Sequence, residues 1–201
     1  MNIDYLIDAE NNKRTLIFDL DNTLYDEFNY IELAYKEVAN CYSSQNKKEA
    51  FDYLLSEFKE GRRQGLFNRL ISKYPESPNL LDILNVFRNP KYVKLNFYPW
   101  FQYFLSVVSL NFKLLILTNG NVEQQKKKVN MLGVENLECF EECIFANEYE
   151  PKPSIKSYDM FTKVETFNSP IYIGDSDVDL IFSKRLGIEY FDVKNLYGDT
   201  L

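Results

Sequence analysis

The chain has 201 residues, 45% of them hydrophobic and 16% aromatic, so it can bury one ample core and is too apolar to remain disordered. The formal net charge of −7 argues against a general nucleic-acid-binding surface, which needs clustered positive charge. The sequence contains no histidine, which excludes Ser-His-Asp and Cys-His catalysis and histidine-ligated zinc. Any catalysis must therefore use carboxylates, lysine, hydroxyls or a hard metal ion.

The sequence also carries signals about compartment. No apolar run approaches the length of a membrane span. The first residues include Asp4, Asp8 and Glu10, unlike the basic start of a signal peptide. The cysteines show no CxxC spacing and suggest neither a disulfide framework nor a zinc site. We therefore expect a cytoplasmic protein that associates with neither membranes nor nucleic acids.

Short apolar segments that end in turn residues recur along the chain and predict buried strands. Each is an unalternating run, which is typical of a parallel sheet covered on both faces. Helical stretches between them suit βαβ crossovers, so the sequence predicts an α/β fold with a doubly wound, mostly parallel, Rossmann-like sheet. The expected strands are residues 15–19, 113–118, 142–146, 170–174 and, with a weaker pattern, 188–193.

The interval between the first two expected strands is too long for one crossover and has little strand character. Its breaks fall at glycine and proline, the residues that punctuate helices. We therefore predict an inserted all-helical cap subdomain at residues 28–93, acting as a lid on an α/β core formed by residues 1–27 and 94–201. The expected cap helices are residues 30–43, 47–61, 64–74 and 79–89.

Three helices are expected in the second part of the core. Pro99 restarts the core with a helix before the second strand. Residues 122–132 form a helix that Gly133 closes. Pro153, in a first-turn position, opens another helix over residues 154–167.

Polar residues follow the ends of the expected strands. In an open α/β sheet, ligands bind beyond the carboxyl ends of the strands, near the point where the strand order reverses. A doubly wound sheet would bring these residues together from distant parts of the chain. They are Asp19 and Asp21 after the first strand, Thr118 and Asn119 at the end of the second, Lys152 after the third, and Asp175 and Asp179 after the fourth.

The sequence contains four motifs that, in this order, resemble those of the haloacid dehalogenase superfamily: Asp-Leu-Asp-Asn-Thr-Leu, Thr-Asn-Gly, Lys-Pro and Gly-Asp-Ser-Asp-Val-Asp. The helical insertion after the first motif resembles the cap of the subfamily with an all-helical lid. The resemblance covers nearly the whole chain. It implies a magnesium-dependent phosphatase.

The resemblance also implies a role for each acidic residue. Asp19 would be the nucleophile that forms an aspartyl-phosphate, and Asp21 would protonate the leaving oxygen and later deprotonate a water. The Asp19 side chain, the Asp21 backbone carbonyl and Asp175 would hold Mg²⁺, which prefers hard oxygen ligands. Asp179 would support this site by binding the metal waters or orienting neighbouring groups.

Three further residues would bind the phosphate in this family pattern. Thr118 would hydrogen-bond the phosphoryl oxygens, and Asn119 would add backbone N–H contacts. Lys152 would hold Asp19 and balance the clustered negative charge, because like charges raise one another's pKa values.

The motifs favour hydrolysis of a small phosphomonoester, and both a nucleoside monophosphate and a sugar phosphate remain open as substrates. The nearest alternative is a phosphomutase, which would return the phosphoryl group to the substrate. Dehalogenation is disfavoured because it needs neither an acid two residues after the nucleophile nor a metal-binding acid cluster. A non-catalytic binding scaffold is disfavoured because Asp19, Asp21 and Lys152 are all present. We expect a monomer or a homodimer that acts on a small phosphorylated metabolite.

Two features leave alternatives open. Arg62, Arg63 and Arg69 in the predicted cap would either contact the substrate or form a solvated helix face, and we favour the solvated face because basic residues are mostly exposed. Residues 1–13 would either pack on the core or extend freely.

Overall fold

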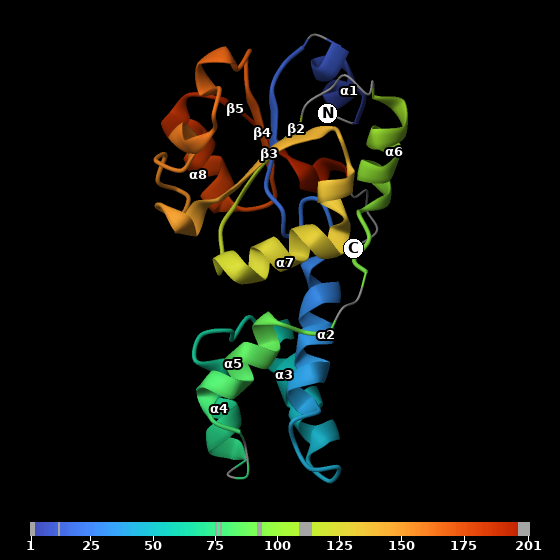
Figure 1. The fold of residues 1–201 in the computed structure, drawn as a ribbon, viewed down its shortest axis with the longest axis vertical. Helices are drawn as coiled ribbons and strands as arrows, with labels where there is room; N and C mark the ends of the chain where they lie inside the picture. The colour runs from blue at the N-terminus through green and yellow to red at the C-terminus, as the bar shows by residue number, and fades with distance from the viewer. Residues whose placement is uncertain are drawn as a thin grey trace. The chain divides into compact units, whose positions relative to one another are not determined.

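The computed structural model describes residues 3–11, 13–74, 76, 78–91, 94–108 and 114–196. The chain divides into two compact units, one of Met1–Asp26 with Lys94–Leu201 and one of Glu27–Val93. The first contains the sheet and the second is built of helices (Figure 1). Val93 at the expected cap boundary and Lys113 at the start of the second expected strand lie outside the described residues. The assignment of residues 28–93 as a lid stays a prediction.

The first unit is built on five strands: β1 (Leu16–Phe18), β2 (Leu114–Thr118), β3 (Phe140–Phe145), β4 (Ile171–Gly174) and β5 (Glu189–Asp192). They form one sheet in the order β3-β2-β1-β4-β5, and every neighbouring pair is parallel. The chain therefore runs from the central β1 to one side of the sheet and then returns to the other side. This confirms the doubly wound α/β fold and puts the switch point beside β1. The helices of this unit are α1 (Ile3–Asn11), α6 (Pro99–Val107), α7 (Val122–Leu132) and α8 (Asp177–Leu186).

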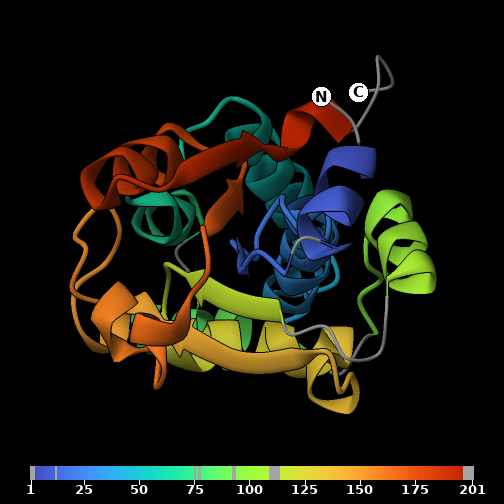
Figure 2. The ribbon, with the colours of Figure 1, turned by 90° about the horizontal axis from the view of Figure 1, so that it is seen from above.

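Helices cover both faces of the sheet (Figure 2). On one face, the Phe18 ring of β1 packs against Phe101 and Phe104 of α6, with ring centroids 5.5 and 6.3 Å away. On the other face, Ile17 belongs to a buried cluster that includes Phe182 of α8. Because successive strand residues point to opposite faces, a strand covered on both sides is apolar throughout. This explains the unalternating pattern of the sequence.

The prediction of a helix over residues 154–167 is wrong. The segment instead contains two 3₁₀ turns, η3 (Tyr158–Met160) and η4 (Val164–Thr166). A 3₁₀ helix has three residues per turn, so side chains three positions apart lie on one side. In this segment, side chains three positions apart pack against the sheet, whereas an α-helix would repeat every 3.6 residues. The side chains that recur at this spacing are Tyr158 and Phe161 in the buried cluster, and Val164 and Phe167 packed against it.

The N-terminal helix α1 packs on the first unit. Leu6 is fully buried, and the Tyr5 ring stacks on Phe191 of β5 with centroids 6.0 Å apart. Arg14 donates to the Tyr5 hydroxyl over 2.9 Å and pairs with Glu189 at 2.5 Å. The residues of α1 are therefore part of the core, not a free extension.

The second unit consists of α2 (Glu27–Ala39), α3 (Lys47–Lys59), α4 (Leu66–Lys73) and α5 (Leu80–Arg88). Each overlaps an expected helix, and α2 differs most, because residues 30–43 were expected. The Tyr35 ring of α2 lies 6.3 to 6.4 Å from those of Phe58 in α3 and Phe67 in α4, so the three helices share one aromatic core. In the described part of the chain, no helix is both long enough and apolar enough to span a membrane.

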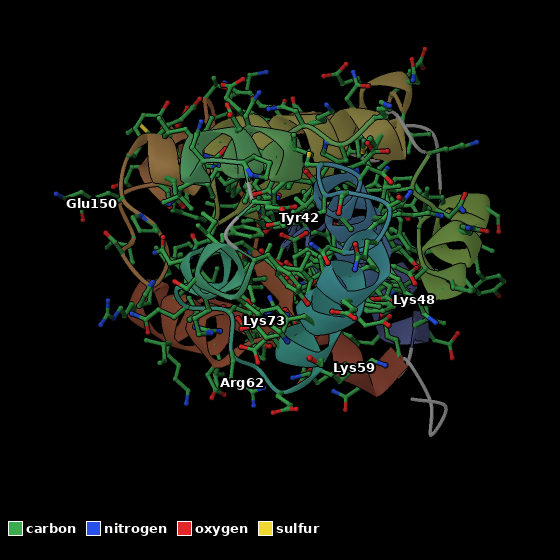
Figure 3. The ribbon with its side chains drawn as sticks, turned by 90° about the horizontal axis from the view of Figure 1, so that it is seen from below. Tyr42, Lys48, Lys59, Arg62, Lys73 and Glu150 are labelled. Atoms are coloured by element: carbon green, nitrogen blue, oxygen red, sulfur yellow. The ribbon has the colours of Figure 1, made fainter. Side chains whose placement is uncertain are left out.

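Three arginines of the second unit, Arg62, Arg63 and Arg69, pair with acids of the same unit. Glu57 is 5% exposed and accepts hydrogen bonds from Arg62 and, at 2.6 Å, from Arg69. These bonds lower the pKa of Glu57 to about 2. Arg63 pairs with Glu27 at 3.1 Å. The exposed cations of this unit include Lys48, Lys59 and Lys73 (Figure 3).

Candidate active site

The carboxyl ends of the strands bring the predicted residues to one edge of the sheet. Asp19 follows β1 directly, and its backbone N–H donates to the Ile173 carbonyl of β4 over 2.8 Å. Thr118 is the last residue of β2, and Asp175 follows β4. Lys152 reaches the same place from the loop after β3.

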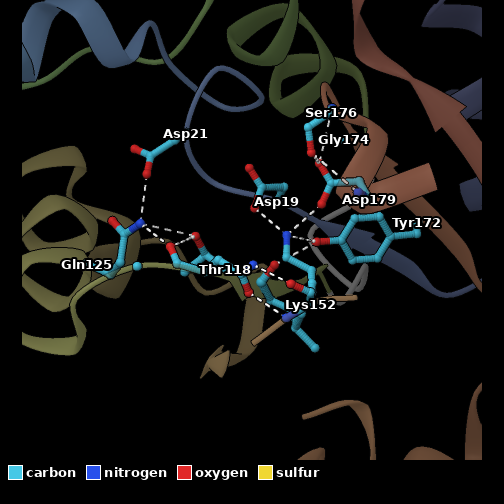
Figure 4. A network of polar contacts seen from close by, with 12 residues as sticks. Asp19, Asp21, Thr118, Gln125, Lys152, Tyr172, Gly174, Ser176 and Asp179 are labelled. Carbon is cyan, nitrogen blue, oxygen red and sulfur yellow. Dashed lines mark hydrogen bonds and ion pairs between the residues drawn. The ribbon is translucent and has the colours of Figure 1, made fainter. Parts of the chain in front are cut away.

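Lys152 is the centre of this site (Figure 4). Its Nζ donates to Asp19 Oδ1, Asp179 Oδ1 and the Tyr172 hydroxyl, each at 2.6 Å. An ammonium group has three N–H donors, so these three acceptors match its full capacity. The Tyr172 hydroxyl in turn donates to the Leu117 carbonyl over 2.7 Å. The lysine is therefore held rigidly although it is only 5% exposed.

Three carboxylates beside Lys152 form a group that can hold a cation. One oxygen from each of Asp19, Asp175 and Asp179 lies within 4.8 Å of the others. Burial, reinforced by the Asp179 charge, raises the pKa of Asp175 to about 6 and also raises the pKa of Asp19. Three carboxylates and one ammonium leave two negative charges, which a divalent cation would neutralise. Since Mg²⁺ prefers hard oxygen ligands, this donor set fits it.

Asp179 is fixed by the start of α8. Its Oδ2 accepts from the Ser176 hydroxyl at 2.5 Å and from the Ser176 backbone N–H at 3.2 Å, which completes a capping box. Gly174 allows this arrangement, because a Cβ there would lie 2.7 Å from Asp179 Cγ. The glycine of the fourth motif therefore makes room for the carboxylate behind it.

The Asp21 side chain belongs to a second polar group. Both its oxygens contact Lys128 Nζ, at 2.8 and 2.9 Å, and Gln125 Nε2 donates to Oδ2 over 2.7 Å. The Tyr25 hydroxyl donates to Oδ1. Burial alone would raise the pKa of Asp21, but Lys128, Gln125 and Tyr25 together outweigh it and lower that pKa. Lys128 thus neutralises the Asp21 carboxylate, and this ion pair is separate from the three carboxylates beside Lys152.

Thr118 and Asn119 connect the two groups. Thr118 Oγ1 lies 3.4 Å from Gln125 Nε2. The Asn119 side chain accepts from the Lys152 backbone N–H at 2.8 Å and donates to the Lys152 carbonyl at 2.9 Å. Asn119 therefore joins the loop after β2 to the loop that carries Lys152, a bracing contact that the sequence did not predict.

The structure brings Asp19, Lys152, Asp175 and Asp179 together, and places the Asp21 side chain beside α7. The sequence interpretation missed Gln125, Lys128 and Tyr172. The sequence did contain a signal for Gln125 and Lys128. They occupy two positions of the i, i+3, i+4, i+7 pattern that forms the buried face of α7, and two apolar residues occupy the other two positions. Those apolar residues are Val129 and Leu132.

The fold and this site define an α/β protein with a carboxylate- and lysine-based site at the switch point of a doubly wound sheet. The chain belongs to the haloacid dehalogenase-like hydrolase family, whose model matches residues 16–193. This confirms the resemblance inferred from the four motifs. No curated protein sequence shows significant similarity to the chain.

Three solved structures illustrate the likeness of fold. A Thermotoga maritima protein named as a β-phosphoglucomutase aligns with a TM-score of 0.65 and 20% identity, over 89% of this chain and 84% of that one. The Bacillus subtilis hydrolase YfnB, solved with magnesium, gives 0.63 and 20%, over 88% and 85%. L-2-haloacid dehalogenase from Xanthobacter autotrophicus gives 0.55 and 17%, over 88% and 76%. At these identities the likeness concerns the fold alone.

Proposed function

We propose that this family member is a Mg²⁺-dependent phosphatase that hydrolyses a small phosphomonoester through an aspartyl-phosphate on Asp19. The observation that carries the proposal is the bridge from Lys152 Nζ to Asp19 and Asp179, 2.6 Å to each, beside a third carboxylate. A nucleophilic carboxylate must approach an anionic phosphate, so the site has to hold positive charge around both.

In the first step, an Asp19 oxygen attacks phosphorus while the bond from phosphorus to the leaving oxygen breaks. The leaving oxygen takes a proton from Asp21, which enters this step in its carboxylic acid form, and departs as an alcohol. Lys152 orients Asp19 through their hydrogen bond. The Thr118 hydroxyl and the Asn119 backbone N–H are the proposed donors to the phosphoryl oxygens.

In the second step, water attacks phosphorus of the aspartyl-phosphate and gives a proton to Asp21. The bond between phosphorus and the Asp19 oxygen breaks, which releases inorganic phosphate and restores the Asp19 carboxylate and the acid form of Asp21. The same side chain thus acts first as an acid and then as a base, and the site returns to its starting state.

The Asp19 side chain, the Asp21 backbone carbonyl and Asp175 would hold the Mg²⁺, with Asp179 in support. Bound Mg²⁺ supplies charge neutralisation between these oxygens and the phosphoryl group. The two uncompensated negative charges beside Lys152 support this assignment, as does the magnesium bound to the similar fold of YfnB.

The occurrence of Asp21 distinguishes this proposal from dehalogenation, which needs no acid at that position. A phosphomutase is the second candidate, because the structurally similar Thermotoga maritima protein carries that name and the chemistry uses the same residues. The two differ only in whether water or substrate takes the phosphoryl group.

Phosphate release from a panel of nucleotides, sugar phosphates and short phosphorylated acids tests the proposal, with Mg²⁺ and with a chelator. Mg²⁺-dependent release concentrated on one chemical class supports a phosphatase and names its substrate class. Isomerised sugar phosphate without released phosphate would favour the mutase. No turnover of any compound would reject both.

A further inference from the structure

The second polar group places donors on both oxygens of Asp21. Lys128 Nζ lies 2.8 Å from Oδ1 and 2.9 Å from Oδ2, and Gln125 Nε2 lies 2.7 Å from Oδ2. Tyr25, four residues beyond Asp21, donates to Oδ1. The two donors from α7 therefore reach the carboxylate across more than a hundred residues of sequence and fix both of its torsions.

This arrangement is built into the buried face of α7. Gln125 and Lys128 are each 3% exposed. Burying an ammonium group is unfavourable unless it is paired, so a buried lysine marks a position where its charge is needed. Gly120 makes the approach possible, because a Cβ there would lie 2.7 Å from Gln125 Nε2. Gln125 also donates to the Asn119 carbonyl over 2.5 Å, which ties it to the loop after β2.

We propose that Lys128 and Gln125 are positioning residues that hold the Asp21 carboxylate in the orientation needed for proton transfer to the leaving oxygen. The inference rests on the proposed function, in which Asp21 carries that proton. A displacement of about 1 Å in a reacting group can lower a rate about 100-fold, so fixing a flexible side chain has a large effect.

The geometry also explains why the donor is a lysine. Tyr25 and Gln125 each donate to one oxygen of Asp21, whereas Lys128 Nζ lies within hydrogen-bond distance of both oxygens. Lys128 spans both oxygens, so it can keep one while the other exchanges a proton. A donor that contacts only one oxygen would lose its hydrogen bond when that oxygen takes up the proton. Asp21 thus stays positioned in both steps of the reaction.

The test compares substrates that differ in their need for a proton. An aryl phosphate with an electron-poor ring releases its leaving group as a stable anion, whereas an alkyl phosphate needs protonation. The parameter kcat/KM reports the steps up to departure of the leaving group. Asp21→Asn should lower kcat/KM for the alkyl phosphate far more than for the aryl phosphate, which defines the signature of a lost acid.

Lys128→Met should show the same signature, with a loss of about 100-fold on the alkyl phosphate and little change on the aryl phosphate. Lys128→Arg should restore part of the loss, and Gln125→Leu should give a weaker form of it. Adding Lys128→Met to Asp21→Asn should cause no further loss, because residues that act as a unit are not additive. Lys127→Met on the same helix is the matched control and should behave as wild type.

Equal losses of kcat/KM on both substrates in Lys128→Met and Gln125→Leu, with folding intact by circular dichroism, would overturn the positioning role. A further loss in the double variant would overturn it as well. Wild-type protein that releases no phosphate from either substrate would instead reject the proposed function, and the inference with it, before any variant is compared.

Discussion

Replacing Lys152 by methionine should destabilise the protein strongly. The side chains of Lys152 and Asp179 are each 2% exposed, and that of Asp19 is 10% exposed, so the change leaves buried carboxylates without their counter-charge. Removing one partner of a buried ion pair costs about 3–5 kcal/mol. For a chain of this size each kcal/mol lowers Tm by about 2–4 °C, so we expect Tm to fall by about 6–20 °C.

Thermal unfolding in the presence of a chelator measures this effect, with Lys156→Met as the control. Lys156 lies in the same loop and pairs with Glu150, but their side chains are 68% and 45% exposed. An exposed pair contributes less than about 1 kcal/mol, so the control should change Tm by a few degrees at most. Added Mg²⁺ should recover part of the loss in Lys152→Met, because it supplies positive charge to the same oxygens.

The loss in Lys152→Met should also depend on pH. Burial raises the pKa of Asp19 above its unfolded value, so the folded state binds its proton more tightly. Stability from such a group is present at low pH and is lost as pH rises through the folded pKa. The difference in Tm between Lys152→Met and wild type should therefore be smaller at about pH 5 than at about pH 8. If Lys152→Met unfolds at the same temperature as Lys156→Met at both pH values, the electrostatic account of the site is wrong.

Two further predictions concern Asp19 and the second unit. Asp19→Asn should reduce phosphate release to background with an unchanged circular dichroism spectrum, since an amide cannot form the acyl phosphate and Lys152 keeps its contact with Asp179; normal turnover would reject the nucleophile. Glu57→Gln should destabilise the second unit at neutral pH, as seen by faster amide exchange in α3 and α4. The arginines lower the pKa of Glu57 from 4.5 to about 2 in the folded state. The difference in stability between Glu57→Gln and wild type should therefore be largest above the pKa of the unfolded state and should vanish as pH falls through the pKa of the folded state. A difference that does not change with pH would contradict the pairing.

The strands could be predicted because their pattern and their environment agree. β1, β2 and β4 are buried at every position, so they are apolar apart from the Tyr172 hydroxyl and the terminal Thr118. Residues 154–167 have the composition of a helix, but their aromatic side chains pack on the sheet at a spacing of three. Local propensity cannot report that choice, because it depends on a surface formed by distant parts of the chain.

The carboxylates of the site could be predicted for a similar reason. Parallel strands put their carboxyl ends at one edge of the sheet. Polar residues that directly follow the strands, such as Asp19 and Asp175, therefore lie at the same edge whatever the details of packing. Lys128 and Tyr172 lie inside a helix and a strand, where a polar residue is usually read as a partly exposed one. Only the tertiary contacts, Lys128 to Asp21 and Tyr172 to Lys152, reveal them as parts of the site.

The two polar groups differ in charge, and this difference predicts where a cation binds. Asp175 belongs to the group with two uncompensated negative charges, whereas Asp21 is neutralised by Lys128. Asp175→Asn should therefore weaken Mg²⁺ affinity, measured by calorimetry, by about tenfold or more. Asp21→Asn combined with Lys128→Met removes one charge of each sign and keeps the Asp21 backbone carbonyl, so it should leave Mg²⁺ affinity nearly unchanged. Equal weakening in both proteins would mean that the Asp21 side chain also serves the metal, and that it is not reserved for proton transfer.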